Sequence, residues 1–336
     1  MASTPASSST QFALQDEDWS KTWRQLAAPS ISQNGAMVTG APGGWLAVST
    51  RDQDGTKAPP PSDSFAYFST DGTHWRAIPT PGDSSLQGAS VAYGGGHYLI
   101  TGSRGTSVVL DSTDGETWHE QSLEGPSFAF YNGPAAYAGG RFFYMSGTFW
   151  GSMDGEHWAA LPHDYPFALF DHIAYGNGVY LGVGTQMQLS SDGAEWRAAP
   201  LDCTLPIDCY TDPDGTLYPY PLGGVFFAEG RFHAFQLTSP EGELTSPDGE
   251  VWQFVPGPFP DAYVGGHFTQ FLGAQPRVWL PGDSTPRPIE VSSMPVPLPA
   301  PFPVQPPADV DLSWSDGIDC TNARCVVVHS KLYLVP

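Results

Sequence analysis

Apolar and polar positions alternate in short runs along the whole chain, and Gly-rich turns separate the runs. The plainest case spans 173–184, where Ile-Ala-Tyr is followed by Gly-Asn-Gly and then by Val-Tyr-Leu-Gly-Val-Gly. Related segments begin at Val91, Ala135 and Val225. The runs are rich in Val, Tyr, Phe and Trp, and no long stretch has helical periodicity. This pattern predicts an all-β protein built from hairpins.

A second pattern, Ser-x-Asp-Gly-x-x-Trp, occurs five times, at 69–75, 112–118, 152–158, 190–196 and 246–252. Asp-Gly between apolar runs predicts a tight turn, because Gly adopts a positive φ without steric cost and the Asp carboxylate accepts from nearby backbone amides. The Trp then lies on the departing strand, where we expect it to point inward. We interpret the repeated residues as structural and not catalytic: Asp71, Trp75, Asp114, Trp118, Asp154, Trp158, Asp192, Trp196, Asp248 and Trp252.

One hairpin and one turn motif together make a unit of four short strands. The repeated Asp positions are 43, 40, 38 and 56 residues apart, which is the period of propeller blades. The four hairpins and three weaker starts make seven units; the weaker starts are 36–50, which leads into the first turn motif, 266–281 and 325–335. The predicted fold is therefore an all-β, seven-bladed β-propeller of four-stranded antiparallel blades.

The two chain ends complement each other. Residues 18–23 are typical of the last turn of a unit without its first strands, and the C-terminal segment supplies strands without a last one. Pairing them closes the ring and removes open sheet edges. We predict one propeller domain over 11–336, after a disordered tether or cloning-derived start at 1–10. It contains an insertion at 201–220 and an extended Pro-rich connection at 295–308, since Pro cannot donate to a ladder.

The charge balance excludes several partners. Lys and Arg number 13 against 35 Asp and Glu, a formal net charge of −22. Such a surface disfavours nucleic-acid backbones and anionic membranes. No apolar run approaches the roughly 18–20 residues of a membrane helix. We expect no nucleic-acid partner, no transmembrane segment and a monomer.

The four cysteines form two close pairs, Cys203 with Cys209 and Cys320 with Cys325. Each pair brackets a short loop that a disulfide can close. A zinc site of four thiolates is the alternative, but no His is placed to support it. Disulfides indicate an oxidising compartment, so we expect a secreted, cell-surface or periplasmic protein, with a lipid anchor as one means of attachment.

The turn motif resembles the Asp-box, or BNR, repeat, usually Ser-x-Asp-x-Gly-x-Thr-Trp, although these copies are one residue shorter. The resemblance covers nearly the whole chain. Sialidases, xyloglucan-active glycosidases, sortilin-type receptors, photosystem II assembly factors and exported bacterial propellers share this repeat. The chain lacks the Arg-Ile-Pro motif of sialidases, and its acidity differs from the basic patch of the photosystem factors. The resemblance therefore implies a fold and not a function.

In Asp-box propellers the turn motifs lie on the face opposite the binding face. The resemblance therefore implies that a binding site lies at the connections between units and at the loops between the second and third strands of each unit. These are rich in aromatic residues, and aromatic rings with a few polar groups suit sugar rings or an apolar peptide. We expect a binding module for a glycan or protein partner; aromatic filling of the channel mouth is the alternative interpretation. The binding candidates are Tyr131, Asn132, His163, Tyr165, His172, Tyr218, Tyr220, Tyr263 and His267.

The alternative function is a polysaccharide-acting hydrolase or lyase. Its candidate catalytic residues are Asp164, Asp171 and His172. Asp164 and Asp171 could form a carboxylate pair, whereas Asp171 and His172 are neighbours on one strand and should point to opposite faces. No cofactor or metal is expected: the segments 52–55 and 212–215 have the spacing of a partial calcium loop, but we interpret both as turns, with calcium as the alternative.

Overall fold

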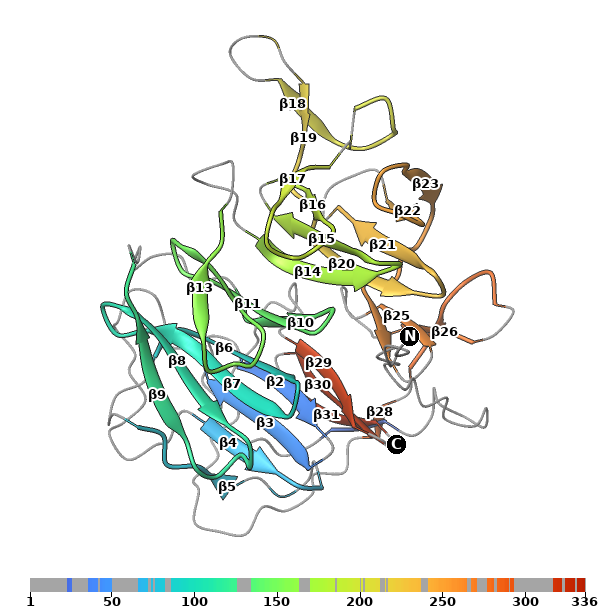
Figure 1. Cartoon of the computed structure of the whole chain (residues 1–336). Helices are drawn as coiled ribbons and strands as arrows, with labels where there is room; N and C mark the ends of the chain where they lie inside the picture. Colours follow the sequence, from blue (N-terminus) through green and yellow to red (C-terminus); the bar gives the residue numbers. More distant parts are fainter. Residues whose placement is uncertain are drawn as a thin grey trace, which may run out of the picture.

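The computed structural model describes 23–25, 36–41, 43–49, 66–71, 74, 76–81, 86–125, 134–162, 170–184, 186–199, 201, 203–211, 215, 217–236, 241–264, 267–270, 277–280, 283–289, 291–292, 317–321, 324–329 and 331–335. Every regular element in these ranges is a β-strand, as expected (Figure 1). Among the described residues no helix has the length and hydropathy of a membrane span.

Six sheets each contain four antiparallel strands in chain order. The first two blades are β2 (Ala36–Ala41), β3 (Gly44–Ser49), β4 (Ala66–Ser69) and β5 (Arg76–Ala77), then β6 (Gln87–Gly94), β7 (His97–Ser103), β8 (Ser107–Ser112) and β9 (His119–Leu123). The third and fourth are β10 (Ala136–Ala138), β11 (Arg141–Met145), β12 (Phe149–Ser152) and β13 (Trp158–Ala160), then β14 (Phe170–Gly176), β15 (Val179–Gly184), β16 (Gln188–Ser190) and β17 (Arg197–Ala198). The fifth and sixth are β20 (Gly224–Ala228), β21 (Arg231–Phe235), β22 (Gly242–Ser246) and β23 (Gln253–Pro256), then β24 (Ala262–Val264), β25 (His267–Gln270), β26 (Arg277–Trp279) and β27 (Arg287–Pro288).

Two further sheets complete the described structure. A two-stranded hairpin, β18 (Cys209–Thr211) and β19 (Leu217–Pro219), lies within the predicted insertion. A five-stranded sheet has the order β28-β1-β31-β30-β29 and joins both chain ends. Its strands are β1 (Trp23–Gln25), β28 (Val291–Ser292), β29 (Gly317–Thr321), β30 (Arg324–His329) and β31 (Lys331–Val335).

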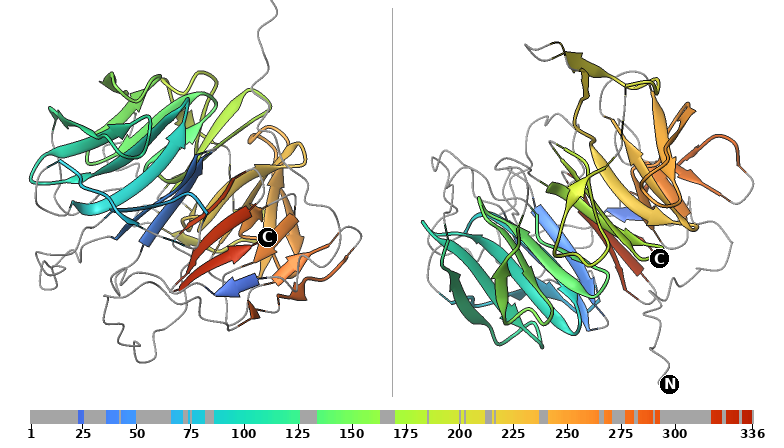
Figure 2. Two further views of the ribbon diagram at one scale, coloured as in Figure 1. Left: turned by 90° about the horizontal axis from the view of Figure 1, so that it is seen from below. Right: turned by 45° about the horizontal axis from the view of Figure 1, so that its top comes forward.

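The described structure is thus a β-propeller with six four-stranded blades in chain order, and a seventh blade stays a prediction. The segment counted as the seventh start forms β30 and β31 of the five-stranded sheet. The predicted pairing of the chain ends is present, because β1 pairs antiparallel with β31 and parallel with β28. The edge strand β29 of this sheet contacts both β2 and β24, as Figures 1 and 2 also show for β2. The predicted tether and the Pro-rich connection lie outside the described residues.

The hydrophobic core lies between neighbouring blades. Successive strand residues point to opposite sheet faces, so Phe142 packs with the second blade and Phe143 with the fourth. Separate clusters fill the boundaries between blades one and two, two and three, three and four, and four and five. Both faces of these sheets are therefore buried, which explains the nearly continuous apolar strands.

The Ser-x-Asp-Gly turns have the predicted hydrogen bonds. In the second blade, Ser112 Oγ accepts from Gly115 N at 2.9 Å, and Asp114 Oδ1 accepts from the amides of Glu116 and Thr117, each at 2.7 Å. Gly115 has φ +71°, and a Cβ there would lie 2.7 Å from the Phe68 ring of the first blade. Glycine thus serves both the turn and the close approach of two blades. The same bonds recur at 152–158, 190–196 and 246–252.

The repeated Trp residues point inward where the structure describes them. Trp118, Trp196 and Trp252 are buried, and Trp158 is half-buried. Trp75 lies outside the described residues. The predicted structural role of the motif is consistent with this packing.

Asp114→Asn is expected to flatten the acid side of the stability profile. Backbone hydrogen bonds from Thr117 and Glu116 lower the pKa of Asp114 from 3.8 to about 2. Stability linked to a depressed carboxyl pKa is fully present above the unfolded-state value and is lost as pH falls toward the folded-state value. The urea midpoint of the parent should therefore fall more steeply than that of the variant between about pH 4 and pH 2. Glu124→Gln, an exposed change outside the turns, is the control; parallel profiles for the parent and Asp114→Asn would contradict the expectation.

Candidate functional site

The two ends of the propeller differ in their connections. In a four-stranded antiparallel blade, the first and third connections lie at one end and the second lies at the other. We call the end with the Gly-rich and Ser-x-Asp-Gly turns the turn face. The opposite end, which carries the connections between blades and the loops between second and third strands, is the loop face.

The structure separates the predicted binding residues. Tyr263 and His267 flank the turn from β24 to β25 and so lie at the turn face, contrary to the expectation. The physical reason is that β24 already begins at Ala262 and holds Tyr263 against Phe268, with ring centroids 4.9 Å apart. His267 is buried. Four binding candidates and one catalytic candidate lie outside the described residues: Tyr131, Asn132, His163, Tyr165 and Asp164.

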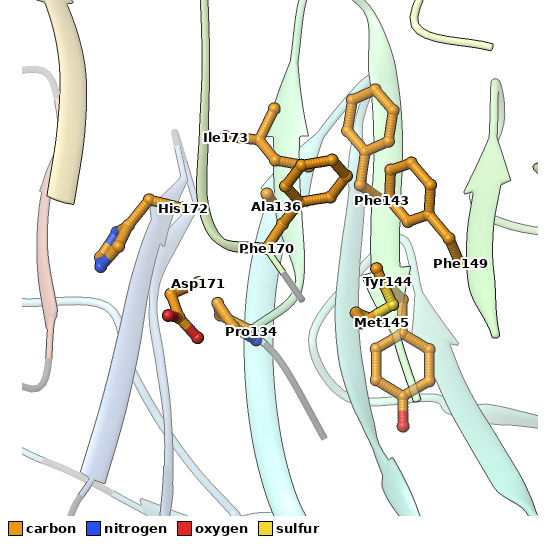
Figure 3. A pocket seen from close by; sticks show the side chains of 10 residues that line it. All are labelled: Pro134, Ala136, Phe143, Tyr144, Met145, Phe149, Phe170, Asp171, His172 and Ile173. Atoms are coloured by element: carbon orange, nitrogen blue, oxygen red, sulfur yellow. The ribbon is translucent and has the colours of Figure 1, made fainter. Parts of the chain in front are cut away.

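Asp171 and His172 lie at the loop-face end of β14. The pairing of β14 with β15 shifts register between Phe170 and His172, which breaks the strict alternation that we expected. Figure 3 shows both side chains turned away from the cluster of Phe143, Phe149 and Phe170. The register shift therefore removes the strand alternation on which the prediction of opposite faces rests.

The pKa shifts of Asp171 and His172 are not those expected of an acid–base pair. Desolvation raises the pKa of Asp171, and desolvation lowers the pKa of His172 even though its ring is reached by solvent. Both shifts favour the neutral forms, and neither residue is a cause of the other's shift. The hollow that the described residues leave beside them measures about 10 Å³, close to the size of one water molecule. This geometry gives no support to polysaccharide cleavage at Asp171.

The hairpin β18–β19 projects from the loop face beside the fourth and fifth blades (Figure 1). The disulfide Cys203–Cys209 closes the loop at its base, with an S–S distance of 2.00 Å and a Cα–Cα distance of 6.2 Å, as predicted. The backbone partners Cys320 and Cys325 face each other across β29 and β30. Their side chains lie outside the described residues, so a second disulfide stays a prediction.

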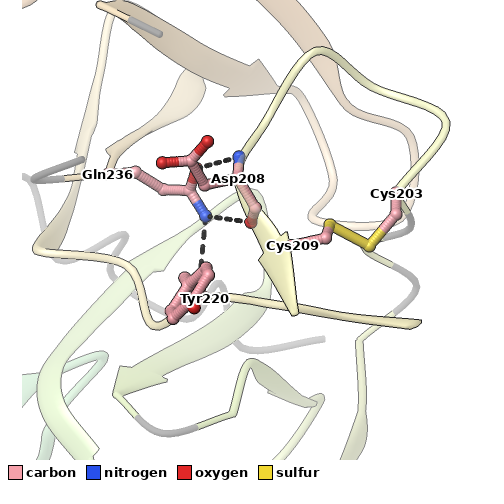
Figure 4. Close-up of a disulfide and its surroundings, with 5 residues drawn as sticks. All are labelled: Cys203, Asp208, Cys209, Tyr220 and Gln236. Carbon is pink, nitrogen blue, oxygen red and sulfur yellow. Dashed lines mark hydrogen bonds between the residues drawn. A yellow bond between two sulfur atoms is a disulfide. The ribbon is translucent and has the colours of Figure 1, made fainter. Parts of the chain in front are cut away.

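Gln236, at the end of β21, fixes the base of this hairpin to the fifth blade (Figure 4). Its Nε2 donates to Tyr220 O at 3.0 Å and to Asp208 O at 3.2 Å, and its Oε1 accepts from Asp208 N at 2.9 Å. The side chain is 6% exposed, so these bonds satisfy a buried amide. Sequence reasoning did not identify Gln236, because its partners are 16 and 28 residues away.

Two tyrosines on this braced hairpin are exposed. Tyr210 is 42% and Tyr220 44% exposed, and their ring centroids lie 5.3 Å apart at 57°. Tyr220 was predicted to lie at the binding face, whereas Tyr210 was not among the predicted residues. The position of Tyr210 directly after Cys209 was the sequence feature that could have indicated it. Tyr218 is the backbone partner of Tyr210, but its side chain is not described. The pair presents aromatic surface on a support held by a disulfide and three hydrogen bonds.

Solved structures with this fold include several propellers. YCF48 bound to D1 peptide has a TM-score of 0.56 and 13% identity, over 93% of this chain and 93% of that one. The WD40 β-propeller domain of Doa1 has a TM-score of 0.54 and 11% identity, over 93% and 97%. The extracellular domain of the one component system BT4673 from B. thetaiotaomicron has a TM-score of 0.56 and 7% identity, over 93% of this chain and 39% of that one. No protein-family model and no curated protein sequence matches the chain. At these identities the likeness shows the β-propeller fold alone.

Proposed function

We propose that this propeller is a binding module that recognises a segment of a protein partner on its loop face. The observation that carries the proposal is the exposed pair Tyr210 and Tyr220 on the braced hairpin. Tyrosine offers a large contact area at low cost in conformational entropy, and hydrogen-bonds through its hydroxyl. Because the hairpin is fixed before binding, little of the binding free energy is lost in ordering it.

The charge of the chain favours a basic segment. A net charge of −22 attracts Lys- and Arg-rich partners and repels acidic ones. The likeness to YCF48, which was solved with a bound peptide, is consistent with a propeller that takes a peptide ligand. A glycan is the alternative ligand, since the same rings can stack on a sugar.

We propose export for this protein, as a secreted or surface-anchored protein. The disulfide Cys203–Cys209 supports an oxidising compartment. It braces the hairpin that carries the proposed site, so reduction should loosen that hairpin.

We also propose that the five-stranded sheet serves as the seventh blade and that the turns are Asp-box repeats. The contacts of β29 with β2 and β24 support the first point, and the repeated Ser and Asp hydrogen bonds support the second.

The double variant Tyr210→Ala with Tyr220→Ala is expected to weaken peptide binding by 10-fold or more, about 1.4 kcal/mol, while the melting temperature changes little. The probe is a displayed library of random peptides, selected with the parent protein. Selected peptides should be rich in Lys and Arg, and their affinities should be measured by isothermal titration calorimetry.

Met153→Ala is the matched control, because it removes an exposed apolar side chain, 65% exposed, from the turn face. It should leave the affinity unchanged. Equal binding by the double variant and the parent would overturn the proposed site. A library that yields no ligand, together with glycan-array binding that the double variant loses, would assign the same site to a glycan.

A further inference from the structure

Ion pairs link neighbouring blades at equivalent places on the turn face. Arg76, which follows the motif Trp of the first blade, donates from Nη2 to Glu116 Oε1 at 2.7 Å, and Glu116 follows the motif Gly of the second blade. Arg197 and Glu250 make the same pair between the fourth and fifth blades. Between the second and third blades the equivalent residues are His119 and Glu156. A histidine thus stands where the other two boundaries have arginine.

The second blade adds two more ligand-type side chains at this boundary. His97 Nδ1 lies 2.8 Å from Asp111 Oδ1, and both side chains are largely buried. One ligand atom from each of His97, Asp111 and Glu156 lies within 4.8 Å of the others. The motif turn of the third blade closes over the carboxylate, since a Cβ on Gly155 would lie 3.5 Å from Asp111 Oδ1.

The fold itself does not require a polar pair at these positions. The strand register places Arg141 and Gly151 there in the third blade, and Val179 and Leu189 in the fourth. Burying the carboxylate of Asp111 therefore has a cost that other blades avoid. The cluster therefore differs from a group of charged side chains that is simply exposed to solvent.

The cluster opens to solvent through a hollow of about 390 Å³. Asp111, His119 and Glu156 line it. Asp111 and His119 are backbone partners across β8 and β9, which places their side chains on the same sheet face. The strands and turns involved, β7, β8, the start of β9 and the turn after β12, belong to adjacent blades (Figure 1). The hollow gives an ion a path to the buried part of the cluster.

We propose that His97, Asp111 and Glu156 bind a divalent transition-metal cation of the Zn²⁺ type, with His119 as the fourth ligand. Two imidazoles and two carboxylates match the nitrogen and oxygen ligands that zinc takes in tetrahedral sites, whereas calcium prefers oxygen alone. Ligand atoms around a zinc ion are about 3–4 Å apart. Ion binding therefore requires the three ligand atoms, which lie within 4.8 Å of one another, to draw together and the exposed side chain of His119 to turn toward them. The ion would join the second and third blades, as the Arg–Glu pairs join others.

The test is Zn²⁺ binding by the chelator-treated full chain, measured by isothermal titration calorimetry. The parent should bind one Zn²⁺ with a micromolar or lower Kd and gain several degrees in melting temperature, because the ion binds the folded state preferentially. Glu156→Gln should weaken Zn²⁺ binding at least 10-fold. Glu116→Gln, the same turn position in the preceding blade, should leave it unchanged.

Co²⁺ gives a second readout, because tetrahedral Co²⁺ with nitrogen and oxygen ligands absorbs strongly in the visible range. His119→Gln should remove or shift these bands while the protein stays folded, since His119 is exposed. If Glu156→Gln and His119→Gln bind Zn²⁺ as the parent does, the site is wrong. If the parent binds no Zn²⁺ at 1 mM, a concentration about a thousand times the expected Kd, the proposal is overturned, and His119 and Glu156 only occupy the positions that the Arg–Glu pairs have elsewhere.

Discussion

Trp196→Ala is expected to lower the free energy of unfolding by about 3–5 kcal/mol, the usual cost of truncating a buried aromatic residue to Ala. Trp196 is 5% exposed and lies between the third and fourth blades. Its ring contacts Phe170 at 5.0 Å, Phe149 at 5.6 Å and Phe143 at 5.8 Å between centroids. Truncation would remove all of these contacts and leave a cavity that rigid neighbouring sheets cannot close. Urea unfolding followed by circular dichroism measures the change.

Trp196→Phe is the matched control. The indole Nε1 of Trp196 has no hydrogen-bond partner among the described residues, so Phe loses little polar interaction and keeps an aromatic ring in the cluster. We expect a cost below about 1.5 kcal/mol for this milder change. If Trp196→Ala cost no more than Trp196→Phe, the interblade cluster would not be the principal source of stability at this boundary.

Deletion of residues 1–25 is expected to lower the melting temperature by roughly 3–4 °C, as a loss of about 2–3 kcal/mol would do in a chain of this size. The deletion removes β1, which pairs with β31 on one side and β28 on the other. Both partners would then expose unpaired backbone groups, and the open edge would favour association between molecules. Differential scanning calorimetry and light scattering measure the two effects.

Deletion of residues 1–20 is the control for this prediction, because it shortens the chain but keeps β1 (Trp23–Gln25). It should melt close to the parent temperature and give the same light-scattering mass per chain as the parent. Equal melting temperatures for the two deletions would show that β1 does not hold the five-stranded sheet together.

The blades could be predicted from the sequence because their information is local. Gly-Asn-Gly at 176–178 and Asp-Gly at 192–193 set tight turns between apolar runs, and such turns fix the pairing of the strands they join. The disulfide Cys203–Cys209 is also local, since its loop spans a sequence separation of 6. In each case residues close in sequence must meet in space, whatever the rest of the chain does.

The positions of the candidate site residues were predicted less well from the sequence. Tyr263 was assigned to a loop, but the early start of β24 placed it by the turn face. Asp171 and His172 were expected to alternate, but the register shift in β14 turned both away from the aromatic cluster. Strand ends and bulges depend on packing between blades, which a pattern of apolar positions within one blade does not contain.

The sequence by itself determined the strands, the turns, the local disulfide and the repeat that makes a propeller, because all of these depend on neighbours within about one blade length. The sequence also predicted that the chain ends pair, but only the tertiary structure decided which strands meet in their sheet, how Gln236 holds the hairpin of Tyr210 and Tyr220, and how His97, Asp111 and Glu156 come together. These arrangements join segments 14 to more than 300 residues apart. Their formation depends on packing between blades and on closing the ring, constraints that no single segment of the sequence encodes.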